Sequence, residues 1–138
     1  MTTLTWEDKF NTGVETLDGQ HRKIFDYMIT IYNGLIDSHL KCDPFNGMLD
    51  QLELLCQLHF MEEEKLMDES NYPLASEHKH LHDLFLTSIS LFKIDNKQCH
   101  TSNVLTEFSN LRVDFITHML NDCWAASEGC QFAARGGD

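Results

Sequence analysis

Apolar side chains recur along most of the chain at steps of three and four residues, the spacing that gathers them on one face of an α-helix. Four such stripes follow one another, and no strand-like alternation competes with them. The stripe positions are His21, Phe25, Met28, Tyr32 and Leu35; Leu49, Leu52, Cys56, His59, Glu63 and Leu66; Leu74, His78, Leu81 or His82, Phe85, Ile89 and Phe92; and Val104, Phe108, Leu111, Phe115, His118 and Asp122. The pattern predicts four amphipathic helices.

Residues with the chemistry of helix starts precede each stripe. They are Asp18 as an N-cap, Asp43-Pro44, Asn71-Tyr72-Pro73, and Thr101 or Ser102. The first seventeen residues hold no helical period and are interrupted by Gly13, so we expect an extended arm there. The small residues after about Ala125 predict no firm structure.

Short connections, roughly five to eight residues each, separate the predicted helices, and short links favour antiparallel neighbours. The expected fold is all-α: an up-down-up-down antiparallel four-helix bundle with an N-terminal extended arm. A chain of 138 residues fits a single domain. We expect that domain to span residues 1–124 and a tail, residues 125–138, to follow it.

Acidic residues outnumber basic ones by 22 to 10, which gives a net charge of −12. This charge argues against binding to nucleic acid, which needs a basic face, and to an anionic membrane surface. No apolar run approaches the roughly 18–20 residues that span a bilayer, and the N-terminus lacks the features of a secretion signal. We therefore expect a cytoplasmic protein.

Five cysteines are present, an odd number, and no C-x-x-C motif occurs. Neither a disulfide framework nor a structural zinc site is expected from this pattern. We expect reduced thiols.

Several polar residues occupy the striped faces, where an apolar side chain would be easier to bury. They are His21, His59, Glu63, His78, His82, His118 and Asp122. Burying an isolated carboxylate or an unpaired imidazole is unfavourable, so seven such residues spread over four helices need a shared partner. By contrast, we assign His39, His80 and His100 to solvent-facing or loop positions.

Six of these residues form pairs four apart: His59 with Glu63, His78 with His82, and His118 with Asp122. Residues four apart on a helix lie about 6 Å from each other on one face, so each pair can direct two donors at one point. Histidine and carboxylate together suit iron, manganese or zinc. Seven donors exceed the four of a tetrahedral zinc site and indicate two metals. Glu62 is a weaker alternative ligand.

If carboxylates bridge the two metal ions, the five histidines cannot be shared equally between them. If Glu63, Asp122 and a hydroxide bridge the two metals, each metal has three oxygen donors. Three histidines then complete one metal at six-coordination, and two leave the other five-coordinate. A small ligand would bind at that open position.

The chain resembles the hemerythrin family, especially its bacterial single-domain members, from about Trp6 to Asp122. The residues that carry the likeness are Trp6, Gly13-Val14-Glu15 and Leu17-Asp18-Gly19-Gln20-His21; the H-F-x-x-E motif His59-Phe60-Met61-Glu62-Glu63; Tyr72-Pro73, His78-Lys79-x-x-His82 and Phe85; and His118. Myohemerythrin is a four-helix bundle, so the resemblance implies the same fold that the stripes predict.

The resemblance implies two non-haem iron ions (Fe²⁺/Fe³⁺) with a bridging hydroxide or oxide. It gives His78, His82 and His118 to the six-coordinate iron, His21 and His59 to the open iron, and Glu63 to both. It also implies reversible binding of dioxygen, for storage, delivery or sensing, by a monomer or weak homo-oligomer that is not an enzyme.

One position departs from the family pattern, in which the bridging aspartate lies five residues after the last histidine. Here that residue is Cys123, and Asp122 comes one earlier. At about 100° per residue, Asp122 lies about 40° from His118 around the helix and Cys123 about 140°. We therefore expect Asp122 to bridge, with a local helix bulge or a Cys123 thiolate as alternatives.

Two other classes of function compete with oxygen binding. A di-iron peroxidase, oxidase or nitric-oxide-handling enzyme would need a wetter pocket than one walled by Phe25, Phe60, Phe85, Phe115 and Trp124. A metal-free interaction bundle would be stabilised by His59→Leu, whereas a metal protein would lose metal and stability. The sequence lacks H-E-x-x-H, and its single Glu77-x-x-His80 motif lies off the stripe, which disfavours zinc-protease and ferritin-like sites.

Overall fold

The structure is a computed structural model that describes residues 5–37, 41–97 and 101–121. Across these residues the chain forms one short 3₁₀ helix and four α-helices, with no strand. They are η1 (Asp8–Phe10), α1 (Glu15–Ile36), α2 (Cys42–Glu69), α3 (Ala75–Asp95) and α4 (Val104–Asn121). The predicted all-α class is confirmed, and Asp122 and the predicted tail lie outside the described residues.

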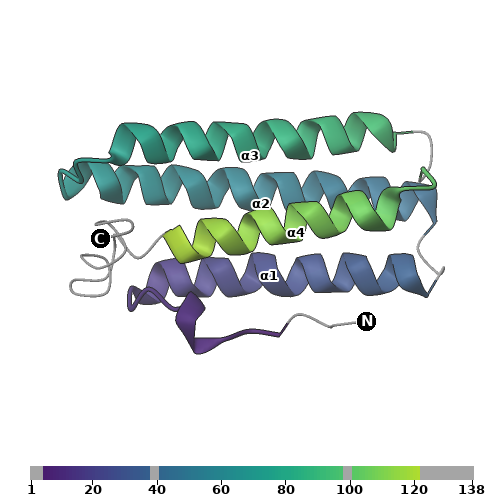
Figure 1. The fold of residues 1–138 in the computed structure, drawn as a ribbon, viewed down its shortest axis with the longest axis horizontal. Helices are drawn as coiled ribbons and strands as arrows, with labels where there is room; N and C mark the ends of the chain where they lie inside the picture. Colours follow the sequence, from purple (N-terminus) through teal and green to yellow (C-terminus); the bar gives the residue numbers. More distant parts are fainter. Residues whose placement is uncertain (1–4, 38–40, 98–100, 122–138) are drawn as a thin grey trace.

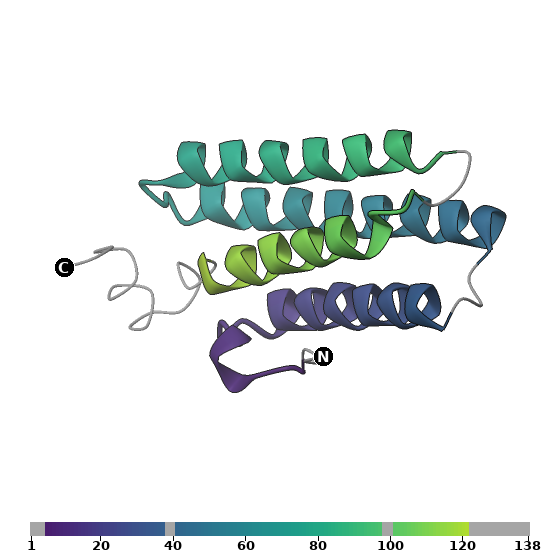
Figure 2. The ribbon, with the colours of Figure 1, turned by 45° about the vertical axis from the view of Figure 1, so that its right-hand side comes forward.

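The four α-helices lie side by side along one long axis (Figure 1). α2 and α3 are joined at one end of the bundle, and α1 ends and α2 begins at the opposite end (Figures 1 and 2). Each helix packs mainly against two others, because α1 contacts α2 and α4, and α3 contacts the same two helices. None of the described helices combines the length and the apolar character needed to cross a membrane.

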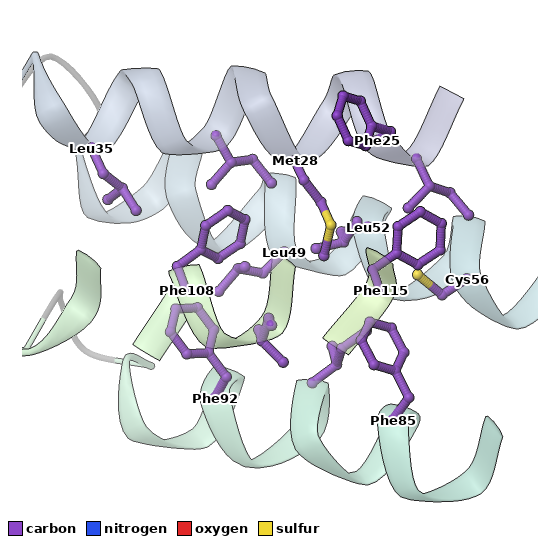
Figure 3. Packing of buried hydrophobic residues seen from close by; sticks show 14 of the residues in the cluster. Phe25, Met28, Leu35, Leu49, Leu52, Cys56, Phe85, Phe92, Phe108 and Phe115 are labelled. Atoms are coloured by element: carbon purple, nitrogen blue, oxygen red, sulfur yellow. The ribbon is translucent and has the colours of Figure 1, made fainter. Parts of the chain in front are cut away.

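Apolar side chains from all four helices meet in the middle of the bundle (Figure 3). Phe108 and Phe115 of α4 are 0% exposed, and their rings face those of Phe92 and Phe85 of α3 at centroid distances of 5.7 and 6.1 Å. Aromatic pairs at such distances add to the free energy gained from burial. This core holds the four helices in fixed register and so positions the polar residues that share their inner faces.

Two predicted stripe positions are wrong. Leu74 is 37% exposed because it precedes α3, which begins at Ala75. Leu81, offered as an alternative to His82, is 47% exposed, whereas His82 is 1% exposed. Adjacent residues lie about 100° apart around the helix, so Leu81 points toward solvent while His82 faces the core.

The start of α1 also differs from the prediction, because the helix begins at Glu15 and Asp18 is not its N-cap. The Asp18 carboxylate instead accepts hydrogen bonds from the Thr12 amide (2.7 Å), the Thr12 hydroxyl (2.8 Å) and the Gly13 amide (3.1 Å). Gly13 has φ +89°, a conformation that glycine adopts without strain. Asp18 therefore fastens the arm to the first turn of α1.

The arm is not simply extended, since η1 turns Phe10 into the core, where it is 2% exposed. Trp6 and Phe10 pack edge-on at 5.4 Å, and Trp6 packs on Phe25 of α1 at the same distance. Apolar burial explains why this segment leaves the extended conformation.

We expect Asp18→Ala to lower the free energy of unfolding by about 1–2 kcal/mol, because three hydrogen bonds to a charged acceptor are lost at a partly exposed site. Urea denaturation measures this change. Asp26→Ala on the same helix is the control, since the ion pair of Asp26 with Arg22 at 3.4 Å is exposed and should contribute under about 0.5 kcal/mol. Equal losses in the two variants would show that Asp18 does not secure the arm.

The expectation of reduced thiols is wrong for Cys42, which is disulfide-bonded. Cysteine spacing along a chain does not reveal which thiols a fold brings together, and this limits the prediction. Cys56 is a free thiol, 0% exposed in the core. Burial, with a smaller contribution from Glu53, raises its pKa, so it packs as a neutral apolar group.

Candidate metal centre

Six of the seven predicted ligands converge inside the bundle, in the half where α1 begins and α2 ends. They come from every α-helix: His21 from α1, His59 and Glu63 from α2, His78 and His82 from α3, and His118 from α4. Five are buried residues, and the side chain of His118 is 8% exposed. The seventh, Asp122, lies just beyond the described end of α4.

Glu63 is the centre of this arrangement and is 0% exposed. Its Oε1 lies 2.6 Å from His82 Nε2, 3.4 Å from His78 Nε2 and 3.8 Å from His118 Nε2. Its Oε2 lies 3.8 Å from His59 Nε2. The two carboxylate oxygens therefore face histidines on different helices.

The donors form two groups that overlap. Within each group the ligand atoms lie within 4.8 Å of one another. The first group is His21, His59, Glu63 and His118, and the second is Glu63, His78, His82 and His118. Glu63 and His118 belong to both groups, and Glu62 belongs to neither. This geometry suits two neighbouring metal ions with a carboxylate between them.

The buried polar atoms supply a test of whether a cation fits. Both oxygens of Glu63 and Nε2 of His82 are buried and make no hydrogen bond in the structure. His82 donates from Nδ1 to Glu64 Oε2 at 2.8 Å, so in the neutral ring Nε2 carries a lone pair. That lone pair faces a carboxylate oxygen at 2.6 Å, which is unfavourable unless a cation or proton lies between them. The donor set therefore fits a bound metal.

Two polar contacts behind the histidines orient their rings. His59 Nδ1 donates to Gln20 Oε1 at 2.7 Å, and His82 Nδ1 donates to Glu64 Oε2. Such contacts fix the tautomer that points Nε2 at a metal. The contacts of Gln20 and Glu64 with the histidines were not predicted from the sequence. Each residue is adjacent in sequence to a predicted ligand, so its side chain points toward a neighbouring helix.

Aromatic rings surround much of the histidine cluster. Phe60 stacks on His82 with centroids 4.0 Å apart and planes 8° apart. Phe115 lies 6.0 Å from the His21 ring and 5.7 Å from the His118 ring, and Phe85 packs against both phenylalanines. Phe25, expected in this wall, packs on the N-terminal arm instead, and Trp124 lies outside the described residues.

A cavity of about 240 Å³ between α3 and α4 reaches this cluster. His78 and His118 line it, together with apolar residues such as Phe85 and polar ones such as Asp114 and Asn121. The cavity gives small molecules an approach to the histidines of α3 and α4. His80, predicted to face solvent, is exposed, whereas His39 and His100 lie outside the described residues.

Comparison with known proteins gives a family and several relatives. The family model of the hemerythrin HHE cation binding domain matches residues 12–122. A bacteriohemerythrin of Stenotrophomonas maltophilia is 27% identical over 94 residues, which cover 68% of this chain but only 60% of that protein. A bacteriohemerythrin of Clostridium acetobutylicum is 26% identical over 116 residues (82% of this chain, 89% of that protein).

A hemerythrin of Phascolopsis gouldii is 30% identical over 92 residues, covering 67% of this chain and 73% of that protein. No solved structure matches the chain. The family model covers most of the chain, including all six residues that converge on the centre. The chain belongs to the hemerythrin family.

Proposed function

We propose that this chain binds dioxygen reversibly at a non-haem di-iron centre and is not an enzyme. The observation that carries the proposal is the pair of overlapping donor groups that share Glu63. Histidine nitrogen with carboxylate oxygen is a donor set that iron accepts. Relatives named hemerythrin and bacteriohemerythrin support the choice of iron and of dioxygen.

In this proposal Glu63 serves both metals, with Oε2 on the side of His59 and Oε1 on the side of His78 and His82. The five histidines act as neutral donors, so the carboxylates balance most of the metal charge. Asp122, one residue after the described end of α4, is proposed as the second bridging carboxylate. A pair of irons, when bound, supplies the two electrons and the open coordination position that dioxygen needs.

The surrounding side chains would favour release of dioxygen unchanged. Phe60, Phe85 and Phe115 cover part of the cluster with apolar rings, so water reaches the histidines mainly through the cavity between α3 and α4. Fewer water molecules at the site mean fewer proton donors for turnover. Iron pairs that act as oxidases or peroxidases need protons delivered to the ligand. The apolar wall therefore supports binding over catalysis.

The test is anaerobic reconstitution with Fe²⁺ followed by exposure to air. We expect two irons per chain and a visible absorption band that appears with dioxygen and disappears when dioxygen is removed. His78→Ala should lose iron, whereas His80→Ala, which changes an exposed histidine on the same helix, should behave like the parent chain. Irreversible oxidation with steady consumption of peroxide would contradict the proposal and favour an enzyme.

A further inference from the structure

We propose that Glu64 makes the metal position beside His78 and His82 the tighter of the two, so that this position fills first. The position beside His21 and His59 is supported by Gln20 and fills second. The inference rests on the proposed two-metal centre and assigns an order to its two positions. Glu64 and Gln20 act here as positioning residues, because each acts through a histidine.

The two supports are alike in geometry. His82 Nδ1 lies 2.8 Å from Glu64 Oε2, and His59 Nδ1 lies 2.7 Å from Gln20 Oε1. In both cases the oxygen accepts the Nδ1 proton, and Nε2 faces the donor cluster. His82 Nε2 lies 2.6 Å from Glu63 Oε1, whereas His59 Nε2 lies 3.8 Å from Glu63 Oε2 and 3.2 Å from His118 Nε2. Both histidine side chains are 1% exposed. The two rings therefore differ little in burial or in hydrogen-bond length.

The two supports differ in charge. A carboxylate that accepts an imidazole N–H makes the opposite nitrogen a stronger donor to a cation, and a neutral amide does so less. The Glu64 side chain is 31% exposed, so part of its charge stays hydrated while Oε2 contacts a buried ring. The position beside His82 therefore gains attraction for a divalent cation that the position beside His59 lacks.

Phe60 adds to this difference by holding one ring more firmly. Its ring is parallel to that of His82, 8° apart at 4.0 Å, but tilted 51° from that of His59 at 5.5 Å. A donor held in its binding orientation loses less conformational freedom when metal binds. Stacking and the Glu64 hydrogen bond thus favour the same position.

The carboxylate of Glu64 and the amide of Gln20 can be exchanged by substitution. Glu64→Gln removes the carboxylate and keeps an acceptor oxygen, while Gln20→Glu adds a carboxylate at the other ring. The double variant Gln20→Glu/Glu64→Gln moves the charge without changing the total. Glu62→Gln is the control, because Glu62 belongs to neither donor group.

The experiment titrates the metal-free full chain, labelled with ¹⁵N-histidine, with Co²⁺. Co²⁺ is a paramagnetic probe of nitrogen and oxygen sites, and NMR reports which hydrogen-bonded Nδ1–H is shifted at the first equivalent. We expect the His82 proton to shift first in the parent chain and in Glu62→Gln. In the double variant we expect the His59 proton to shift first. Glu64→Gln alone should weaken the first binding step by about 10–100-fold.

Each outcome separates this inference from the proposed function. If the parent chain binds two Co²⁺ ions but fills His59 first, or fills both positions together, the inference is wrong and the two-metal centre stands. The same holds if the double variant keeps the parent order. If no Co²⁺ binds at all, the two-metal centre itself is refuted, and the inference with it.

Discussion

Glu63→Gln is expected to abolish the stabilisation that Fe²⁺ gives to the folded chain under anaerobic conditions. A ligand present at a thousand times its dissociation constant stabilises the folded state by about 4 kcal/mol per site. Glu63 belongs to both donor groups, so its loss affects both positions. An amide has one acceptor oxygen and a nitrogen that donates, and it cannot bridge two cations as a carboxylate does.

Without metal the same substitution should have little effect on stability or a favourable one. Both Glu63 oxygens are buried without a hydrogen bond, and an uncompensated buried charge is costly. The amide of glutamine can donate to His82 Nε2, which the carboxylate cannot. The metal-free variant should therefore unfold at the same urea concentration as the parent chain or at a higher one.

Urea denaturation with and without Fe²⁺ measures both effects, and Glu62→Gln serves as the control. The parent chain and the control should gain stability with metal, while Glu63→Gln should not. A Glu63→Gln variant that gained as much as the parent chain would place the metals elsewhere. A parent chain that gained nothing would favour the metal-free interaction bundle.

The convergence of the six side chains could be predicted from sequence because the information for it is local. His59 and Glu63, or His78 and His82, share a helix, and four residues on one helix fix their relative direction without knowledge of the rest of the fold. A polar side chain inside an apolar stripe then indicates a buried polar site. Convergence of the four helices follows from the need to bury the stripes together.

Contacts that cross between helices could not be predicted in this way. Gln20 meets His59 and Glu64 meets His82 only once the rotation of each helix against its neighbour is known. The role of Asp18 depends on a return of the arm to α1, and sequence chemistry suggested an N-cap instead. Whether Asp122 takes the place of the family's aspartate stays a prediction.

Phe108→Ala is expected to lower the free energy of unfolding by about 3–5 kcal/mol, the range for removing a buried phenylalanine. Phe108 is 0% exposed, and its ring meets Phe92 of α3. The control Val113→Ala removes a side chain that is 55% exposed on the same helix and should change stability by under about 0.5 kcal/mol.

Metal should rescue the Phe108→Ala variant, because Phe108 and the metal centre lie in different halves of the bundle. Phe108 precedes His118 by ten residues on α4, about 15 Å along the helix. The folded variant therefore keeps its donors, and saturating metal should restore about 4 kcal/mol per site. Urea denaturation with and without Fe²⁺ measures this. A variant that folds but binds no metal would show that packing near Phe108 controls the donors, which contradicts the independence of the two halves.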